Sequence, residues 1–128
     1  MSALARFFIA LGKTVSGYDR TPSPLTEALQ NESMLVHYTD SPGLIPEEFH
    51  STEGTLVIYT PAIPGDLQEL EFFRSKGHVV YKRSEILGML SEEKKTIAVA
   101  GTHGKTTVST MIAVLLSSTS QGCNAFLG

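Results

Sequence analysis

Short apolar runs alternate with longer stretches of helical periodicity along most of this 128-residue chain. The clearest run, residues 55–59, consists almost entirely of apolar and β-branched side chains, which is typical of a strand buried on both faces of a parallel sheet. Residues 66–76 follow it, with Leu67, Leu70 and Phe73 at helical spacing. This alternation predicts βαβ units and therefore an α/β fold with a mostly parallel sheet.

The same pattern predicts the other elements of the first ninety or so residues. We expect helices at 2–11, at 66–76 and from 84 onward, and strands at 14–18, 35–38, 55–59 and 79–81. The turn at 21–24 opens a further helix that runs through about residue 31, with Thr21 or Ser23 available as its N-cap. Residues 39–54 contain Pro42, Gly43, Pro46 and Gly54, which predicts that most of this stretch is loop, with at most one helical turn. The charged segment 91–95 marks the expected domain boundary, so that residues 1–92 form one domain and residues 93–128 begin another.

Residues 101–107 read Gly-Thr-His-Gly-Lys-Thr-Thr, between an apolar run at 97–100 and an apolar-patterned stretch at 108–116. A strand, a glycine-bearing loop and a helix in this order are the setting of a phosphate-binding loop, whose backbone N–H groups and helix N-terminus face an anion. The longer G-x-x-x-x-G-K-[ST] pattern is incomplete, because Val99 stands where its first glycine would be. The loop therefore predicts a user of ATP.

Seven residues of this loop are candidates for nucleotide binding: Gly101, Thr102, His103, Gly104, Lys105, Thr106 and Thr107. The two glycines let the backbone approach phosphate closely. Lys105 is the catalytic candidate, because its charge would neutralise the phosphoryl group during transfer, and Thr106 would offer its hydroxyl to Mg²⁺. Two roles stay open for Thr107: contact with a phosphate, or a hydroxyl that serves only the start of the helix. For His103 the alternatives are contact with the nucleotide and no functional role.

The composition of the chain limits which binding partners and which cellular compartment we expect. Ten Lys and Arg against thirteen Asp and Glu give a formal charge of −3 without any basic block, so we expect no nucleic-acid partner. The apolar N-terminal stretch is only about eleven residues long, too short to span a bilayer, so we expect no membrane insertion. The single cysteine, Cys123, fits a reducing compartment such as the cytoplasm, and we expect it to be a buried small residue.

Histidines and phenylalanines outside the loop carry no expected function. His37 and His78 have no spacing typical of a metal site, so we interpret both as ordinary surface or strand-end residues. We expect the phenylalanines of the two helices at 2–11 and 66–76 to serve packing alone.

The loop sequence, together with Asn-Ala-Phe-Leu-Gly at 124–128, resembles the ATP-binding domain of the Mur ligases, the ATP-dependent amide-bond ligases that build the peptidoglycan stem peptide. Segments 16–19, 59–63 and 82–87 extend the resemblance over essentially the whole chain. It implies a Rossmann-like UDP-sugar domain with helices on both faces of its sheet, a central P-loop ATPase domain and a C-terminal domain. By that template, residues 1–92 are most of the first domain, and residues 93–128 are the opening strand, loop, helix and second strand of the central one.

The resemblance also implies a UDP-sugar site in the first domain. Its residues would be Asp19, on the uridine side, with Thr60, Ala62, Ile63 and Arg83. Asp19 could instead be a turn-forming cap after a strand, and Arg83 a solvated charge near a helix start. Members of this branch usually carry a strand and a G-x-G-G-x-G turn directly before a methionine that aligns with Met1, so we expect a helix-first domain without that strand and turn.

The implied reaction joins L-alanine to UDP-N-acetylmuramate through an acyl phosphate, formed when the γ-phosphoryl group of ATP is transferred to the sugar's lactyl carboxylate. We expect the chain by itself to be inactive, because it lacks the family's C-terminal domain. Two alternatives stay open. One is a recycling ligase that joins a ready-made peptide to the same UDP-sugar, and the other is a non-catalytic module that binds a UDP-sugar or a nucleotide.

Overall fold

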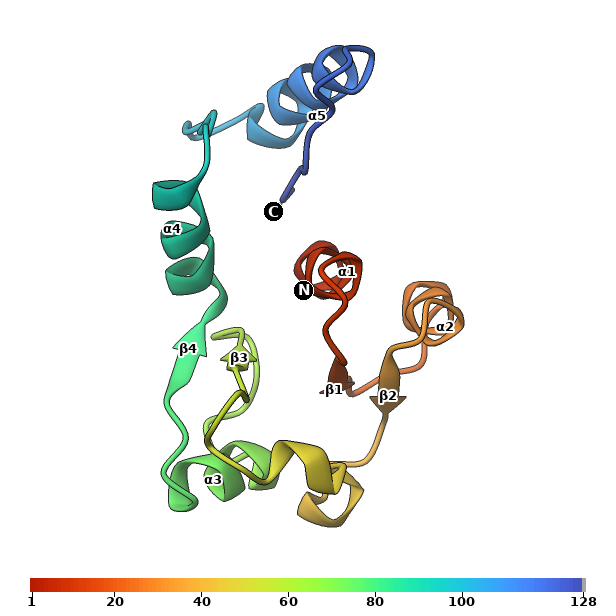
Figure 1. Ribbon diagram of the computed structural model, residues 1–128, viewed down its shortest axis with the longest axis vertical. Coiled ribbons are helices and arrows are strands. Elements are labelled where there is room, and N and C mark those ends of the chain that lie inside the picture. Colours follow the sequence, from red (N-terminus) through yellow and green to blue (C-terminus); the bar gives the residue numbers. More distant parts are fainter. Residues whose placement is uncertain (128) are drawn as a thin grey trace.

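The computed structural model describes residues 1–127 as a mixed α/β chain (Figure 1). Its helices are α1 (Ser2–Ala10), α2 (Pro24–Asn31), α3 (Gln68–Ser75), α4 (Arg83–Glu93) and α5 (Lys105–Ser117), and its strands are β1 (Ser16–Tyr18), β2 (Leu35–His37), β3 (Val57–Tyr59) and β4 (Val80–Lys82). Two 3₁₀ turns, η1 (Pro42–Leu44) and η2 (Glu47–Phe49), lie where a loop was expected. Gly128, the last residue of the expected second domain, lies outside the described residues.

The four strands form two separate parallel pairs. Strand β1 pairs with β2 in the register Ser16 to Leu35, and β3 pairs with β4 in the register Val57 to Val80. One helix connects the strands of each pair, α2 in the first and α3 in the second, so the predicted βαβ units are confirmed. The single sheet that we expected is not formed among the described residues, because no strand joins the two pairs. In Figure 1, β1 and β3 are the inner strands, with β2 and β4 outside them.

Of the two N-caps expected for helix α2, Thr21 and Ser23, the structure uses Ser23, so the helix begins at Pro24. The Ser23 hydroxyl accepts a hydrogen bond from the Thr26 backbone N–H at 3.2 Å, and the Ser23 N–H donates to Thr26 Oγ1 at 2.9 Å. Pro24 occupies the first helical position, where its missing N–H costs nothing. The Tyr38 hydroxyl donates to the same Thr26 oxygen at 3.0 Å, which ties the start of α2 to the residue after β2.

Helix α3 is capped by a residue from the other strand pair. The carboxylate of Asp40, which follows β2, accepts from the backbone N–H groups of Gln68 at 2.8 Å and Glu69 at 3.1 Å. These are N–H groups that a helix cannot satisfy by itself. A negative charge at a helix N-terminus is also stabilising, so Asp40 holds the two βαβ units together at this point.

The core is small and is shared among the elements. Its buried apolar side chains are Leu4, Leu29, Ile45, Leu70 and Ile86. Helices α1 to α4 supply one each and the segment after η1 supplies Ile45. His78 is buried as well, at 7% exposure, with Nε2 3.0 Å from the Ser51 carbonyl oxygen, so of its two interpretations, surface or strand-end residue, the surface one was wrong.

The segment after α4 differs most from expectation. Residues 97–100 form no strand, and Ile97 is 62% exposed, because no strand runs beside them in the described part of the chain. Residues 123–127 also lack the expected second strand. Cys123 is exposed, so its expected burial was wrong. Among residues 1–127, the helices are all too short or too polar to cross a membrane.

The end of the described chain returns to α1. The ring of Phe126 lies 5.8 Å from that of Phe7 in an edge-to-face arrangement, and Arg83 Nη2 donates to the Leu127 carbonyl at 3.2 Å. Helix α5 itself contributes no buried residue, and Figure 1 shows it apart from both strand pairs.

Candidate functional site

The loop at 101–107 turns directly into helix α5. Gly104 has a φ of 76° and is the residue immediately before the helix, and its carbonyl accepts the first helical hydrogen bond from Val108 at 3.0 Å. This left-handed conformation is costly for any residue with a Cβ atom, so glycine is needed here for its backbone freedom. The helix therefore begins at Lys105, with its N-terminal N–H groups at the end of the loop.

The side chain of Lys105 folds back over this loop. Its Nζ donates to the Gly101 carbonyl at 2.7 Å, which places the ammonium group between the first glycine and the helix start. A Cβ atom at Gly101 would lie 3.4 Å from the His103 carbonyl oxygen, so the loop is tight at this point. An anion at the N-terminus of α5 would meet both the helix N–H groups and the lysine charge.

The remaining loop residues lie on the surface. Thr102 and His103 are exposed in the loop, while Thr106 and Thr107 are exposed in the first turn of α5. Within residues 1–127, acidic, histidine and cysteine side chains gather nowhere in a group of three that could hold a metal ion. Thr106, the expected Mg²⁺ ligand, lies in the first turn of α5, at the end of the loop.

Two of the expected UDP-sugar residues, Asp19 and Arg83, act electrostatically on the amino group of Met1. Burial lowers the pKa of this amino group, the positive charge of Arg83 lowers it further, and the negative charge of Asp19 acts in the opposite direction. Asp19 directly follows β1 and Arg83 opens α4. The structure thus brings two expected UDP-sugar residues from different βαβ units to the start of α1.

Asp19 has the local role that its alternative interpretation predicts. Its Oδ1 accepts from the Thr21 N–H at 3.1 Å, which is an Asx turn, and its own N–H donates to the His37 carbonyl at 3.1 Å. The side chain is nevertheless exposed, so this turn leaves it accessible from solvent.

Arg83 is partly buried, unlike a solvated surface charge. Its Nη2 donates to the Leu127 carbonyl, and its Nε is buried without a hydrogen-bond partner among the described residues. A buried donor left without a partner costs about 1–3 kcal/mol, so an acceptor at this nitrogen would stabilise the side chain.

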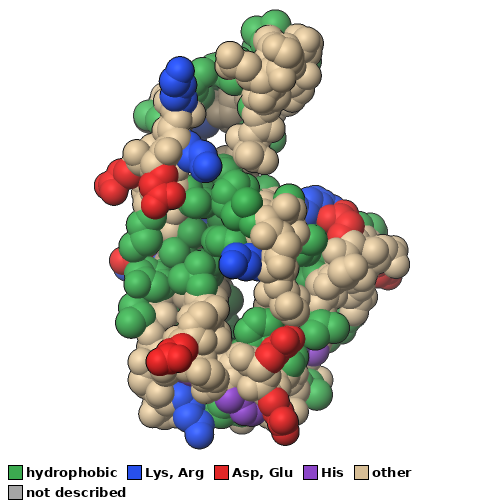
Figure 2. All heavy atoms as spheres, viewed as in Figure 1, with side chains coloured by type: hydrophobic (Ala, Val, Ile, Leu, Met, Phe, Trp, Pro, Cys, Tyr) green, Lys and Arg blue, Asp and Glu red, His purple; other side chains and the backbone are tan. Residues whose placement is uncertain are grey.

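A cavity of about 610 Å³ separates the two strand pairs, and two of the three expected loop residues line it. They are Thr60 and Ile63, joined by a turn in which the Ile63 N–H donates to the Thr60 carbonyl at 3.2 Å. Ala62 lies in the same turn, is exposed and does not line the cavity. Figure 2 shows hydrophobic side chains gathered over the β3–β4 pair and the start of α4.

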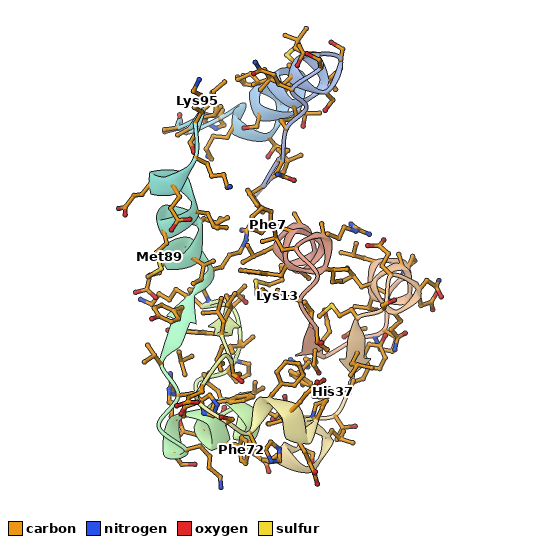
Figure 3. The ribbon with its side chains drawn as sticks, in the orientation of Figure 1. Phe7, Lys13, His37, Phe72, Met89 and Lys95 are labelled. Atoms are coloured by element: carbon orange, nitrogen blue, oxygen red, sulfur yellow. The ribbon has the colours of Figure 1, made fainter. Side chains whose placement is uncertain are left out.

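Sequence reasoning assigned no site role to several polar residues of this cavity, among them Lys13, Tyr18 and Tyr59. Lys13 lies beneath α1 (Figure 3), just before β1. The two tyrosines are the last residues of β1 and β3. Their positions were the available signal, since ligands in α/β folds bind beyond the carboxyl ends of strands.

Comparison with known proteins identifies the family of this chain. Residues 1–95 match the family model described as Mur ligase family, catalytic domain. The chain is 56% identical over all of its 128 residues to the UDP-N-acetylmuramate--L-alanine ligase of Cytophaga hutchinsonii, and 54% and 52% identical to those of Phocaeicola vulgatus and Parabacteroides distasonis. It spans 28% of the length of each of these relatives. Since the family model covers well over half of its residues, the chain belongs to the Mur ligase family.

Proposed function

We propose that this chain is the N-terminal part of an ATP-dependent ligase that joins L-alanine to UDP-N-acetylmuramate in the cytoplasm, in the synthesis of peptidoglycan precursors. The observation that carries the proposal is the loop at 101–107, where Lys105 Nζ lies 2.7 Å from the Gly101 carbonyl at the N-terminus of α5. The relatives named for this activity match over the whole chain, which supports the choice of substrates.

We assign residues 1–92 to a Rossmann-like UDP-sugar domain and residues 93–128 to the start of a P-loop ATPase domain. Both βαβ units lie within the first of these ranges, and α4 ends at Glu93. The family match ends at residue 95, close to this boundary. In the UDP-sugar site, Asp19 lies on the uridine side, Thr60, Ala62 and Ile63 form the loop at a strand end, and Arg83 supplies positive charge.

The proposed chemistry begins with a carboxylate, which is a poor electrophile. Transfer of the γ-phosphoryl group of ATP to the lactyl carboxylate gives an acyl phosphate, and the amine of L-alanine then attacks this carbonyl and expels phosphate. Lys105 stabilises the charge on the phosphoryl group during transfer, and the backbone N–H groups at the start of α5 hold the phosphate oxygens. Mg²⁺, held through Thr106, would neutralise phosphate charge and orient the transferred group. No side chain acts as a nucleophile in this scheme.

A chimeric enzyme tests the proposal. The 128 matching residues of the Cytophaga hutchinsonii ligase are replaced by this chain, and phosphate release is measured with ATP, UDP-N-acetylmuramate and L-alanine. We expect phosphate release that requires all three substrates, with a decrease of about 100-fold or more in the Lys105→Ala variant, because the lysine charge acts in the transition state. The isolated chain should release none.

Lys95→Ala is the matched control, since Lys95 is an exposed lysine that precedes the loop (Figure 3). We expect this variant to keep full activity. A folded chimera that is inactive, or one that loses activity equally in both lysine variants, would contradict the proposal. A chimera that accepts a peptide in place of L-alanine would favour the recycling ligase instead.

A further inference from the structure

Strand β2 has an outer edge that faces away from β1. The Leu35 N–H donates to the Val15 carbonyl at 3.0 Å, and the His37 carbonyl accepts a hydrogen bond from the residue after β1 at 3.1 Å. The backbone groups of Leu35 and His37 therefore face β1, and in a parallel pair the residues between them point the opposite way. The backbone groups of Val36, and of Met34 just before the strand, lie on the outer edge.

Helix α2 already bonds to two of these outward groups. The Met34 N–H donates to the Leu29 carbonyl at 3.0 Å, and the Val36 carbonyl accepts from Gln30 Nε2 at 3.1 Å. Leu29 and Gln30 both lie in the last turn of α2. The helix that connects β1 to β2 thus also closes the outer edge of β2, and the closure uses residues of one βαβ unit only.

The two contacts differ in how readily they open. The contact between Leu29 and Met34 joins two backbone groups, whereas the contact with Val36 comes from the side chain of Gln30, which is exposed. Holding a long exposed side chain in one rotamer costs conformational entropy. A rotation of the Gln30 side chain frees the Val36 carbonyl without any change in the backbone.

A hollow of about 500 Å³ lies beside this edge. Gln30 and Val36 line it together with Leu35 and Leu44, which are 51% and 48% exposed. The residues of the described chain that line it include no Asp, Glu, Lys or Arg. A second strand would therefore meet apolar side chains here, and two copies of this edge would meet without like charges that repel each other.

We propose that the outer edge of β2 is a self-pairing surface of this chain, and that the Gln30 side chain is the autoinhibitory contact that keeps it closed. A twofold axis would place Val36 of two copies opposite each other in an antiparallel pair, in which the two residues exchange both N–H···O bonds. While Gln30 occupies the Val36 carbonyl, this pair lacks its acceptor. Covering an edge strand in this way prevents edge-to-edge association. The inference makes no use of the loop at 101–107.

Gln30→Met tests the inference in the whole chain. Methionine matches glutamine in length and helix propensity but has no N–H donor, so it frees the Val36 carbonyl and leaves α2 intact. Sedimentation velocity over a range of concentrations measures the dimerisation constant. We expect this constant to rise about tenfold or more, because neither copy gives up a hydrogen bond on pairing. Hydrogen exchange of the Val36 amide should slow in the dimer.

Gln30→Ala repeats the measurement with the residue of highest helix propensity and should dimerise in the same way. Gln30→Lys keeps a donor for the carbonyl and adds a charge to the edge, so it should dimerise no more than the unchanged chain. Adding Leu35→Lys to Gln30→Met should abolish the gain, because it places a charge on the paired edge of both copies. Since Gln30 and Leu35 are exposed, these variants should keep the fold.

Gln68→Met is the matched control. Gln68 is an exposed glutamine at the start of α3, where its backbone N–H, not its side chain, bonds to Asp40. We expect this variant to dimerise no more than the unchanged chain. Lys105→Ala should not alter the dimerisation constant either, which separates this inference from the proposed ligase activity.

Three results would overturn the inference. In the first, Gln30→Met and Gln30→Ala fold, as circular dichroism reports, and dimerise no more than the unchanged chain. In the second, Gln68→Met gains as much as Gln30→Met. In the third, the amides protected in the dimer lie along β1 or β3 and not at Val36.

Discussion

Glu69 shows how much a single side chain contributes to joining the two βαβ units. It is 6% exposed, and its Oε1 accepts from His37 Nε2 at 2.6 Å and from the Ser41 N–H at 3.2 Å. Figure 3 places His37 at the end of β2 nearest to the turns that follow it. Spacing along the sequence gave no sign of this contact, because His37 and Glu69 are 32 positions apart. The interpretation of His37 as an ordinary strand-end residue missed its partner.

Glu69→Ala should lower the free energy of unfolding by about 1–3 kcal/mol, because it leaves two donors without their acceptor. Urea denaturation followed by circular dichroism measures this change. Glu71→Ala is the control on the same helix, since Glu71 is exposed and pairs only with its helical neighbour Arg74. If both variants lose the same free energy of unfolding, the buried contact does not stabilise the fold.

At the scale of elements, local sequence predicted which elements exist better than where they end. For helix α2 the sequence left Thr21 and Ser23 both open as N-caps, and the structure uses Ser23, with the helix starting at Pro24. The cap of α3 could not be predicted, because Asp40 lies outside the βαβ unit that contains α3. Residues 97–100 have the composition of a strand, but a strand depends on a partner that local sequence does not reveal.

Ser23→Ala should lower the free energy of unfolding by about 1 kcal/mol, the usual value for a lost helix cap. Thermal denaturation of the two proteins checks this expectation. Ser75→Ala serves for comparison, because the Ser75 hydroxyl is exposed at the other end of a helix and bonds only to the Phe72 carbonyl. The capping interpretation fails if Ser23→Ala is no less stable than Ser75→Ala.

An ion pair between α1 and α2 should make stability depend on pH. Arg6 Nε and Nη2 donate to the two oxygens of Glu32 at 2.7 and 2.8 Å, and these hydrogen bonds lower the pKa of Glu32. A carboxyl whose pKa is lowered by folding stabilises the fold above its unfolded pKa, and this contribution disappears as the pH falls through the lowered value.

Arg6→Ala should therefore be less stable than the unchanged chain at neutral pH, and the difference should shrink in acid once Glu32 is protonated. This difference in stability is small, because the side chains of Arg6 and Glu32 are both largely exposed. Urea titrations across the acidic range measure it, with Arg20→Ala as an exposed arginine control. A difference that is constant with pH would contradict the ion pair.

At the scale of the whole molecule, the two candidate sites differ in how much of each could be predicted from the sequence. The loop at 101–107 is continuous in sequence, so its residue types and its position before a helix were sufficient to predict the turn at Gly104 and the start of α5. The grouping of Asp19 and Arg83 around Met1 depends on how two βαβ units pack, and only the resemblance to Mur ligases suggested it beforehand. The division into two strand pairs, with a cavity between β1 and β3, is visible only in the structure.

The most direct test of the proposed function follows oxygen atoms in the chimeric enzyme. UDP-N-acetylmuramate is labelled with oxygen-18 at both oxygens of its lactyl carboxylate and incubated with ATP and L-alanine, and the released phosphate is analysed by mass spectrometry. In the acyl phosphate route the amine expels phosphate together with one carboxylate oxygen, so the account predicts one labelled oxygen in each phosphate released with amide formation. Unlabelled phosphate formed alongside the amide product would contradict it.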